Sequence, residues 1–179
     1  MNALLKLSRG IDGIGAFFGN IADWLVLAAA FISATNATVR YLVNYSSNSW
    51  LEIQWYMFGG MVMLGAAYTL KKNEHVRVDL VYGSLSDRGR LWIDTIGFTV
   101  FFLPIIGLLT YLSFNFFWGS FVSKEVSMNA GGLILWPAKA LLPAGFALLF
   151  LQGISELIKR VAALTGRLNL DTHYEKPVQ

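Results

Sequence analysis

Four long apolar segments fill most of the 179-residue chain, and short polar stretches separate them. The segments cover about residues 21–43, 50–70, 91–118 and 136–158. Each is long enough to cross a bilayer, because a helix needs about 20 residues to span ~30 Å of hydrocarbon. Lipid offers the backbone no hydrogen-bond partners, so each span must be helical. The pattern predicts an all-α integral membrane protein with four transmembrane helices in a single membrane domain over 1–179.

The residues before the first span form a second kind of segment. Over 1–19, apolar side chains recur near helical spacing, with Lys6, Arg9 and Asp12 between them. This predicts a short helix that lies flat in the membrane interface, and a partly ordered tail is the alternative. Three glycines weaken a helix there: Gly10, Gly13 and Gly15. Residues 159–179 predict a polar tail.

The basic residues are distributed unevenly between the two sides of the predicted membrane domain. Of the fourteen Lys and Arg residues, only Arg40, Lys124 and Lys139 fall on one side. The positive-inside rule therefore places both termini and the 71–90 loop in the cytoplasm. A signal peptide cleaved near Ala37 is a weaker alternative, because the apolar segment continues past that residue.

Composition narrows the function classes. The chain is 55% hydrophobic and 14% charged, whereas soluble domains carry about 25% charged residues. The net charge is only +3, and the basic residues are not gathered on one surface, so nucleic acid is not an expected partner. Cysteine is absent, which excludes disulfides and thiolate metal sites.

The start of the second span carries two polar side chains with two open interpretations. Ser49 and Glu52 fit a capping box, in which each side chain satisfies a backbone N–H of the other residue. Alternatively, Glu52 and Gln54 make polar contacts to another subunit, since neither side chain is stable against lipid. Four tryptophans near the span ends predict membrane-interface anchors: Trp50, Trp55, Trp92 and Trp136.

Other polar residues are weak candidates for chemistry. Asp23 falls near the cytoplasmic end of the first predicted span, so we expect it to reach the headgroups rather than to act at depth. His75, with Glu74 and Asp79 nearby, is a poor metal site because ligands usually come in threes or fours. The sequence predicts no catalytic residue, no cofactor and no metal.

The missing features favour an auxiliary role. No Walker motif, no inverted repeat and no mid-span charge are visible in the sequence. Two rival functions stay open. An intramembrane enzyme would need polar groups that converge at depth. A standalone channel or transporter would need a polar pore face, for which Asn36 and Asn115 are too few.

Three stretches and a later motif carry a family resemblance over about residues 21–165. They read LEIQWYMFG over 51–59, LGAAYTL over 64–70, NEHVRVD over 73–79, and GGL with WPAK over 131–139. Together they resemble the DctQ-like small membrane subunit of TRAP (tripartite ATP-independent periplasmic) transporters. The chain departs from the family at Leu135, where a basic residue often precedes the Trp-Pro pair.

The resemblance implies a division of labour in a bacterial inner membrane. A periplasmic binding protein delivers a substrate, usually an organic acid. A large membrane subunit carries it inward by a sodium-driven elevator motion. The small subunit packs on the scaffold of the large one as part of the stator, in contact with membrane lipids and without its own substrate site. It implies structural or intersubunit contacts for Glu52, Gln54, Arg77 and Asp79.

Overall fold

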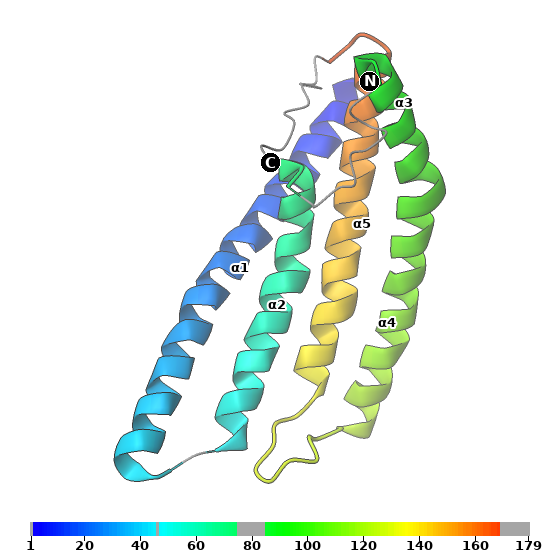
Figure 1. The fold of residues 1–179 in the computed structure, drawn as a ribbon. Coiled ribbons are helices and arrows are strands. Elements are labelled where there is room, and N and C mark those ends of the chain that lie inside the picture. The colour runs from blue at the N-terminus through cyan, green and yellow to red at the C-terminus, as the bar shows by residue number, and fades with distance from the viewer. Residues whose placement is uncertain (1, 46, 75–84, 169–179) are drawn as a thin grey trace.

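The protein folds into a bundle of long helices (Figure 1). The computed structural model describes residues 2–45, 47–74 and 85–168. The described elements are, in chain order, α1 (Asn2–Val43), α2 (Asn48–Lys72), α3 (Asp87–Ile96), the π-helix η2 (Gly97–Phe102), α4 (Leu103–Ser123) and α5 (Trp136–Leu164). Within these ranges the only β pairing is an isolated bridge between Val126 and Ile134. The predicted all-α architecture is confirmed.

Small residues let the helices approach one another closely. A Cβ atom added to Gly19 would lie 2.8 Å from the Tyr68 ring, and one added to Gly145 would lie 2.6 Å from the backbone carbonyl oxygen of Met63. These contacts join α1 to α2 and α2 to α5, so α2 lies between its two neighbours (Figure 1). Close approach through small residues is the usual mode of helix packing in membranes.

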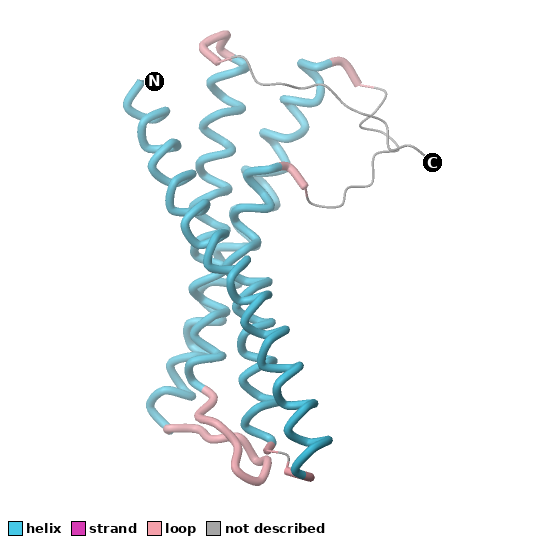
Figure 2. The backbone as a smooth tube through the Cα atoms, turned by 90° about the vertical axis from the view of Figure 1, so that its left-hand side faces the viewer, coloured by secondary structure: helices cyan, strands magenta, loops and turns pink. Residues whose placement is uncertain are grey.

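The first helix differs from the prediction for 1–19. Residues 2–43 form one continuous helix, so the predicted break between an interfacial helix and a span that begins near residue 21 is wrong. In the turned view the helix crosses the others at an angle (Figure 2). Gly15 and Gly19 are buried against α5 and α2. Of the three glycines expected to weaken this helix, only Gly15 belongs to the packing face, because nothing lies within 4 Å of a Cβ added to Gly10 or Gly13.

The described part of the chain contains three helices that are long and apolar enough to cross a membrane. These are α1, α5, and the rod over Asp87–Ser123 that combines α3, η2 and α4. The π turn of η2 lies just before Pro104. Proline lacks the N–H that an α-helix would need there, and the Leu103 N–H bonds to the Phe98 carbonyl five residues back.

The second helix is long enough for a span but less apolar. Its 25 residues include Glu52 and Gln54 in the first turns. By length and hydropathy, α2 is not among the three helices of the described chain that qualify as spans.

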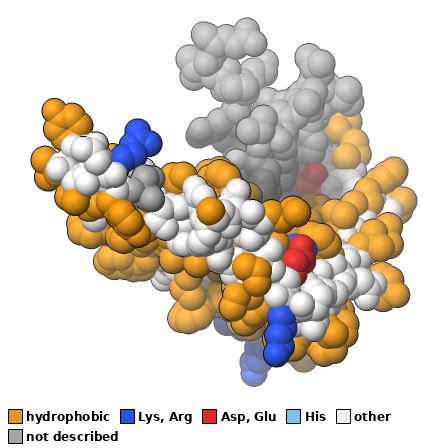
Figure 3. Space-filling model, turned by 90° about the horizontal axis from the view of Figure 1, so that it is seen from below, with side chains coloured by type: hydrophobic (Ala, Val, Ile, Leu, Met, Phe, Trp, Pro, Cys, Tyr) orange, Lys and Arg blue, Asp and Glu red, His pale blue; other side chains and the backbone are white. Residues whose placement is uncertain are grey.

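The sides of the bundle are largely apolar. Viewed from the end that carries the loop between α4 and α5, hydrophobic side chains ring the molecule and charged groups are scattered (Figure 3). Large apolar side chains stand exposed along α1 and α4, among them Phe31, which is 74% exposed, and Tyr111, which is 66% exposed. Surfaces of this kind face lipid or another protein.

Candidate functional site

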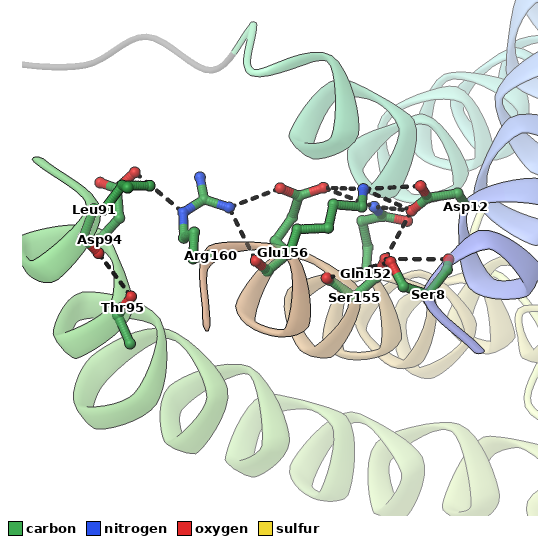
Figure 4. Close-up of polar contacts among 10 residues, drawn as sticks. Ser8, Asp12, Leu91, Asp94, Thr95, Gln152, Ser155, Glu156 and Arg160 are labelled. Atoms are coloured by element: carbon green, nitrogen blue, oxygen red, sulfur yellow. Dashed lines mark hydrogen bonds and ion pairs between the residues drawn. The ribbon is translucent and has the colours of Figure 1, made fainter. Parts of the chain in front are cut away.

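A chain of charged side chains joins three helices at one end of the bundle (Figure 4). Asp12 of α1 lies 2.8 Å from the Lys159 ammonium of α5. Glu156 pairs with Lys159 and with Arg160, at 2.7 Å in both cases. Arg160 then reaches Asp94 of α3 at 3.1 Å. These five side chains are called the ion network here, and they connect α1, α5 and α3.

Neutral side chains complete the bonding of Asp12. Gln152 Nε2 donates to Asp12 Oδ1 at 2.9 Å, and Ser155 Oγ donates to the same oxygen at 2.8 Å. The Ser155 and Ser8 hydroxyls are 2.7 Å apart. Since Ser155 gives its one hydrogen to the carboxylate, Ser8 is the donor in that pair. Gln152 and Ser155 are fully buried, so these bonds form away from water.

The sequence of α5 explains why these groups meet. Gln152, Ser155, Glu156 and Lys159 are spaced three or four residues apart, which puts them on one face of a helix. That face points at the N-terminal half of α1, where Gly15 leaves room for the Gln152 amide. A Cβ at Gly15 would lie 3.1 Å from Gln152 Oε1, so a larger residue there would require the amide to shift.

Arg160 is held from a third direction by an aromatic ring. Its guanidinium carbon lies 4.5 Å from the centre of the Phe98 ring, and Phe98 itself is buried. Arg160 therefore binds two carboxylates in its plane and stacks on a ring, a combination that lysine does not reproduce. Phe98 belongs to the π turn η2, so the irregular turn positions this ring.

The charges in the ion network nearly cancel. Three carboxylates face two cations. The Lys71 ammonium brings a third positive charge nearby and donates a hydrogen bond to the Asp12 backbone carbonyl oxygen at 3.3 Å. Buried charges are tolerated when they are paired and hydrogen-bonded in this way. Among the described residues, no group of three His, Cys, Asp or Glu side chains is placed to hold a metal ion. The arrangement acts as a clamp between helices.

A second polar cluster holds the loop over 124–135 at the other end of the bundle. Glu52 at the start of α2 is only 3% exposed. Its carboxylate accepts hydrogen bonds from the Ser127 hydroxyl, from Asn129 Nδ2 at 2.7 Å and from the Leu133 backbone N–H at 2.7 Å. One buried carboxylate thus satisfies three donors of a segment about 80 residues further along the chain. Ionised acceptors make the stronger hydrogen bonds, so Glu52 fixes the loop shape.

Neighbouring residues of α2 add contacts to the same loop. Asn48 Nδ2 donates to the Ala130 carbonyl at 3.1 Å, Ser49 Oγ donates to the Gly131 carbonyl, and the Tyr56 hydroxyl donates to the Ile134 carbonyl at 3.2 Å. The predicted capping box of Ser49 with Glu52 is wrong, because both side chains bind the loop. The helix begins after Ser47, which makes no side-chain cap.

An ion pair ties the other end of the loop to α5. The Lys139 ammonium donates to the Glu125 carboxylate and also lies 4.1 Å from the centre of the Phe116 ring. The hydrogen bond from Lys139 is the main cause that holds the pKa of Glu125 below its usual value. Glu125 is therefore ionised at neutral pH, and the pair joins the loop to the first turn of α5.

Comparison with known proteins identifies the family. The model of the DctQ component of tripartite ATP-independent periplasmic transporters matches residues 29–163, which is more than half of the chain. The chain belongs to the DctQ family. Searches of curated proteins and of solved structures found no match to it. DctQ proteins are transporter components, so both polar clusters belong to a small membrane subunit of a TRAP transporter, and association with other TRAP components is implied.

The four polar contact residues predicted from the sequence differ in their surroundings in this DctQ component. Glu52 is satisfied inside its own chain, as described above. Gln54 is half-buried, and its Nε2 atom is buried without a hydrogen-bond partner among the described residues. Arg77 and Asp79 lie outside the described residues.

The four predicted anchor tryptophans lie near helix ends. Trp50 and Trp55 stand in the first turns of α2, at 40% and 67% exposure. Trp92 lies in α3 and is half exposed. Trp136 begins α5 and packs edge-on against Phe121 of α4, with ring centres 5.5 Å apart. Their place along the helices is compatible with interfacial belts.

The ion network was not predicted from the sequence. The sequence does contain a signal for it, since Glu156, Lys159 and Arg160 have helical spacing and opposite charges. Asp12 and Asp94 were visible as charges next to apolar segments. Their pairing with α5 could not be predicted, because it depends on how α1 crosses the bundle.

Proposed function

We propose that this DctQ component is the small permease subunit of a sodium-driven TRAP transporter. The transporter takes up organic acids that a periplasmic binding protein delivers, by secondary active transport. In this proposal the chain packs on the scaffold of the large membrane subunit and forms part of the stator against which the elevator moves. It has no substrate site of its own and is not an enzyme.

The family match carries the proposal, and the pairing of charges supports it. The network carboxylates and cations bind one another, and Glu52 binds the chain's own loop. A stator needs rigidity at both ends, and internal bonds of this kind supply it. Groups already bound to one another are not available to coordinate a moving ion or an organic anion.

We also propose that α2 is the fourth span and that both termini are cytoplasmic. The helix packs against α1 from Gly60 beside Leu25 to Tyr68 beside Gly19, and against α5 where Met63 meets Gly145. A helix enclosed in this way shares the depth of its neighbours. The distribution of Lys and Arg supports the cytoplasmic termini in a bacterial inner membrane.

The proposed partners are the large subunit, the binding protein and membrane lipids. Gln54, Arg77 and Asp79 remain proposed interface residues. Gln54 has the clearest structural support, because its buried amide nitrogen has a hydrogen bond to give. An acceptor on a partner helix would satisfy it.

Reconstitution into liposomes tests the function. The small subunit, the large subunit and the binding protein are combined with an inward sodium gradient, and uptake of a labelled organic acid is measured. We expect uptake from the complete set, and a loss of at least about tenfold when the small subunit is omitted. Uptake by this chain alone, or full activity without it, would contradict the proposal.

A further inference from the structure

Asp23 lies at mid-height on the bundle, deeper than its position in the sequence suggests. Its neighbour Ala22 packs at Gly65, where an added Cβ would lie 3.4 Å away, and Leu25 packs at Gly60, where the separation would be 3.0 Å. Asp23 falls between these two levels, close to the height of Met63 on α2. Because α1 is continuous through residue 21, 21 helical residues precede Asp23.

The position of Met63 gives an estimate of depth. It is eight residues from Trp55 and nine from Lys72, or about 12 and 14 Å at a rise of 1.5 Å per residue. If Trp55 and Lys72 mark the two interfaces, Asp23 is near the middle of the hydrocarbon. Ionisable groups at that depth are unfavourable in lipid and normally face protein or water.

Among the residues that the structure describes, none pairs with Asp23. Its side chain is exposed, and it makes no hydrogen bond or ion pair with the described residues, whereas Asp12, eleven residues earlier, has several. Beside it runs a stripe of exposed side chains at alternating spacings of three and four. The stripe consists of Phe17, Asn20, Trp24, Leu27, Phe31, Ala34, Thr38 and Tyr41.

This spacing is the 3.5-residue period of a helix that packs along another helix. The stripe is called the α1 outer face here. Trp24 and Phe31 are 71% and 74% exposed, so the described part of the chain leaves the α1 outer face uncovered. Its large aromatic side chains are of the kind that interfaces bury. The adjacent carboxylate needs a hydrogen-bonding or charged partner wherever it is removed from water.

We propose that the α1 outer face is the docking surface for the large membrane subunit, and that a partner helix presents a cation or a hydrogen-bond donor to Asp23. This inference rests on the proposed function. Charge complementarity selects the occupant. The exposed side of α4 carries no charge that needs a partner, because no Asp, Glu, Lys or Arg occurs between Leu103 and Ser123. This side can therefore face lipid.

A second copy of this chain fits less well than the large subunit. A two-fold axis along the membrane normal through this face would put Asp23 opposite Asp23 at the same depth. Two carboxylates would then face each other in a medium of low dielectric constant, which is unfavourable. On the outer half of α1 the only cation is Arg40, which is 17 residues away from Asp23.

Photo-crosslinking in native membranes tests the assignment. Benzoylphenylalanine replaces Phe31 on α1 in one variant and Tyr111 on α4 in a matched control, since both are exposed aromatic residues. After irradiation, adducts are identified by mass spectrometry. We expect an adduct between the Phe31 variant and the large subunit, and at least about tenfold less from the Tyr111 variant.

Several outcomes would overturn the inference. They are an adduct of the large subunit from Tyr111 only, an adduct from Phe31 to a second copy only, or no protein adduct from Phe31 although the large subunit co-purifies. Those results would leave the proposed function intact. Absence of the large subunit from purified wild-type chain would instead remove the proposed function, and the docking assignment with it.

Substitution of Asp23 gives an independent measure. Asp23→Lys puts a cation where the partner is expected to present a cation or a hydrogen-bond donor. Asp87→Lys is the control, because it changes the net charge by the same amount at an exposed residue of α3. At equal amounts of chain in the membrane, we expect Asp23→Lys to reduce co-purified large subunit about tenfold or more, and Asp87→Lys to leave it unchanged. Equal recovery with both variants would contradict a role for Asp23 in docking.

Discussion

The carboxylate of Asp12 and the ammonium of Lys159 lie 2.8 Å apart, although 147 residues separate them in the chain. This pair fastens the first helix to the last. Lys159 also pairs with Glu156, and Glu156 pairs with Arg160. Because Arg160 pairs with Asp94, the series of ion pairs extends to α3. The end of the bundle is therefore held by directional bonds as well as by packing.

Removal of the Lys159 charge should strongly destabilise the bundle. Lys159→Met leaves Asp12 and Glu156 without their shared cation in a site where all three side chains are at most 17% exposed. Loss of one partner from a buried ion pair costs about 3–5 kcal/mol. Equilibrium unfolding in mixed micelles measures the change in the free energy of unfolding.

The matched control is Lys6→Met, at an exposed position of α1. Its effect should stay within about 0.5 kcal/mol, as is usual for surface substitutions. Equal effects of the two substitutions would show that the ion network does not stabilise this end of the bundle.

Loss of the Glu52 charge should loosen the loop over 124–135. Glu52→Gln keeps the shape of the side chain but weakens its hydrogen bonds to Asn129 and Leu133. Bonds to a charged group contribute about 1.5–3 kcal/mol, against about 1 kcal/mol for neutral ones. We expect amide exchange at Leu133 to accelerate roughly three- to thirtyfold, since 1.4 kcal/mol is a factor of ten. Hydrogen exchange with mass spectrometry gives the rate.

Glu74→Gln is the control for the loop, because Glu74 is exposed at the opposite end of α2. Exchange at Leu133 should be unaltered by this change. Unaltered exchange in Glu52→Gln as well would refute the assignment of Glu52 as the residue that fixes the loop.

Two glycines inside helices should respond in opposite directions to alanine. At Gly145 an added Cβ would lie 2.6 Å from the Met63 backbone oxygen, so α2 and α5 must separate. Overpacking of this kind costs about 1–3 kcal/mol. At Gly59 nothing lies within 4 Å, so alanine should raise helix stability by up to about 1 kcal/mol. Thermal unfolding of Gly145→Ala and Gly59→Ala compares them, and a neutral Gly145→Ala would be inconsistent with the close α2–α5 contact.

The Glu125–Lys139 pair predicts a pH dependence with a definite sign. The hydrogen bond from Lys139 lowers the pKa of Glu125 in the folded protein below its ordinary value of 4.5. The pair therefore contributes stability above pH 4.5, and this contribution is lost as the pH falls through the lowered folded pKa. The difference in Tm between wild type and Glu125→Gln should be constant near neutral pH and shrink below pH 4.5. A difference that grows on acidification would show the opposite sign.

Two helix ends were predicted at the residue where the structure has them, because the apolar segment stops or starts there. The predicted limits at Val43 and Trp136 are helix ends. By contrast, α4 continues to Ser123 and α5 to Leu164, beyond the predicted limits near 118 and 158, because polar residues end the apolar run before the helix ends. The helix over 2–43 was divided near residue 20 because the amphipathic pattern of 1–19 gives way there to an apolar segment, whereas the structure continues as one helix through both patterns.

The polar clusters were less predictable because their partners are distant in sequence. Ser49 and Glu52 have capping-box spacing, yet both bind a loop about 80 residues away. Asp23 was assigned to the interface from its place in an apolar segment, whereas its neighbour Ala22 packs against Gly65 of α2. Which residues of α1 and α2 meet cannot be derived from the spacing of residues along the chain.

The most direct test of this DctQ component as a helper subunit is its composition in the membrane. The tagged chain is extracted from its native membrane in mild detergent, and the co-purifying proteins are sized and quantified by mass spectrometry. The proposal predicts a large polytopic TRAP membrane subunit in about equal molar amount. A stable monomer or homo-oligomer without that subunit would contradict it and favour a standalone channel or transporter.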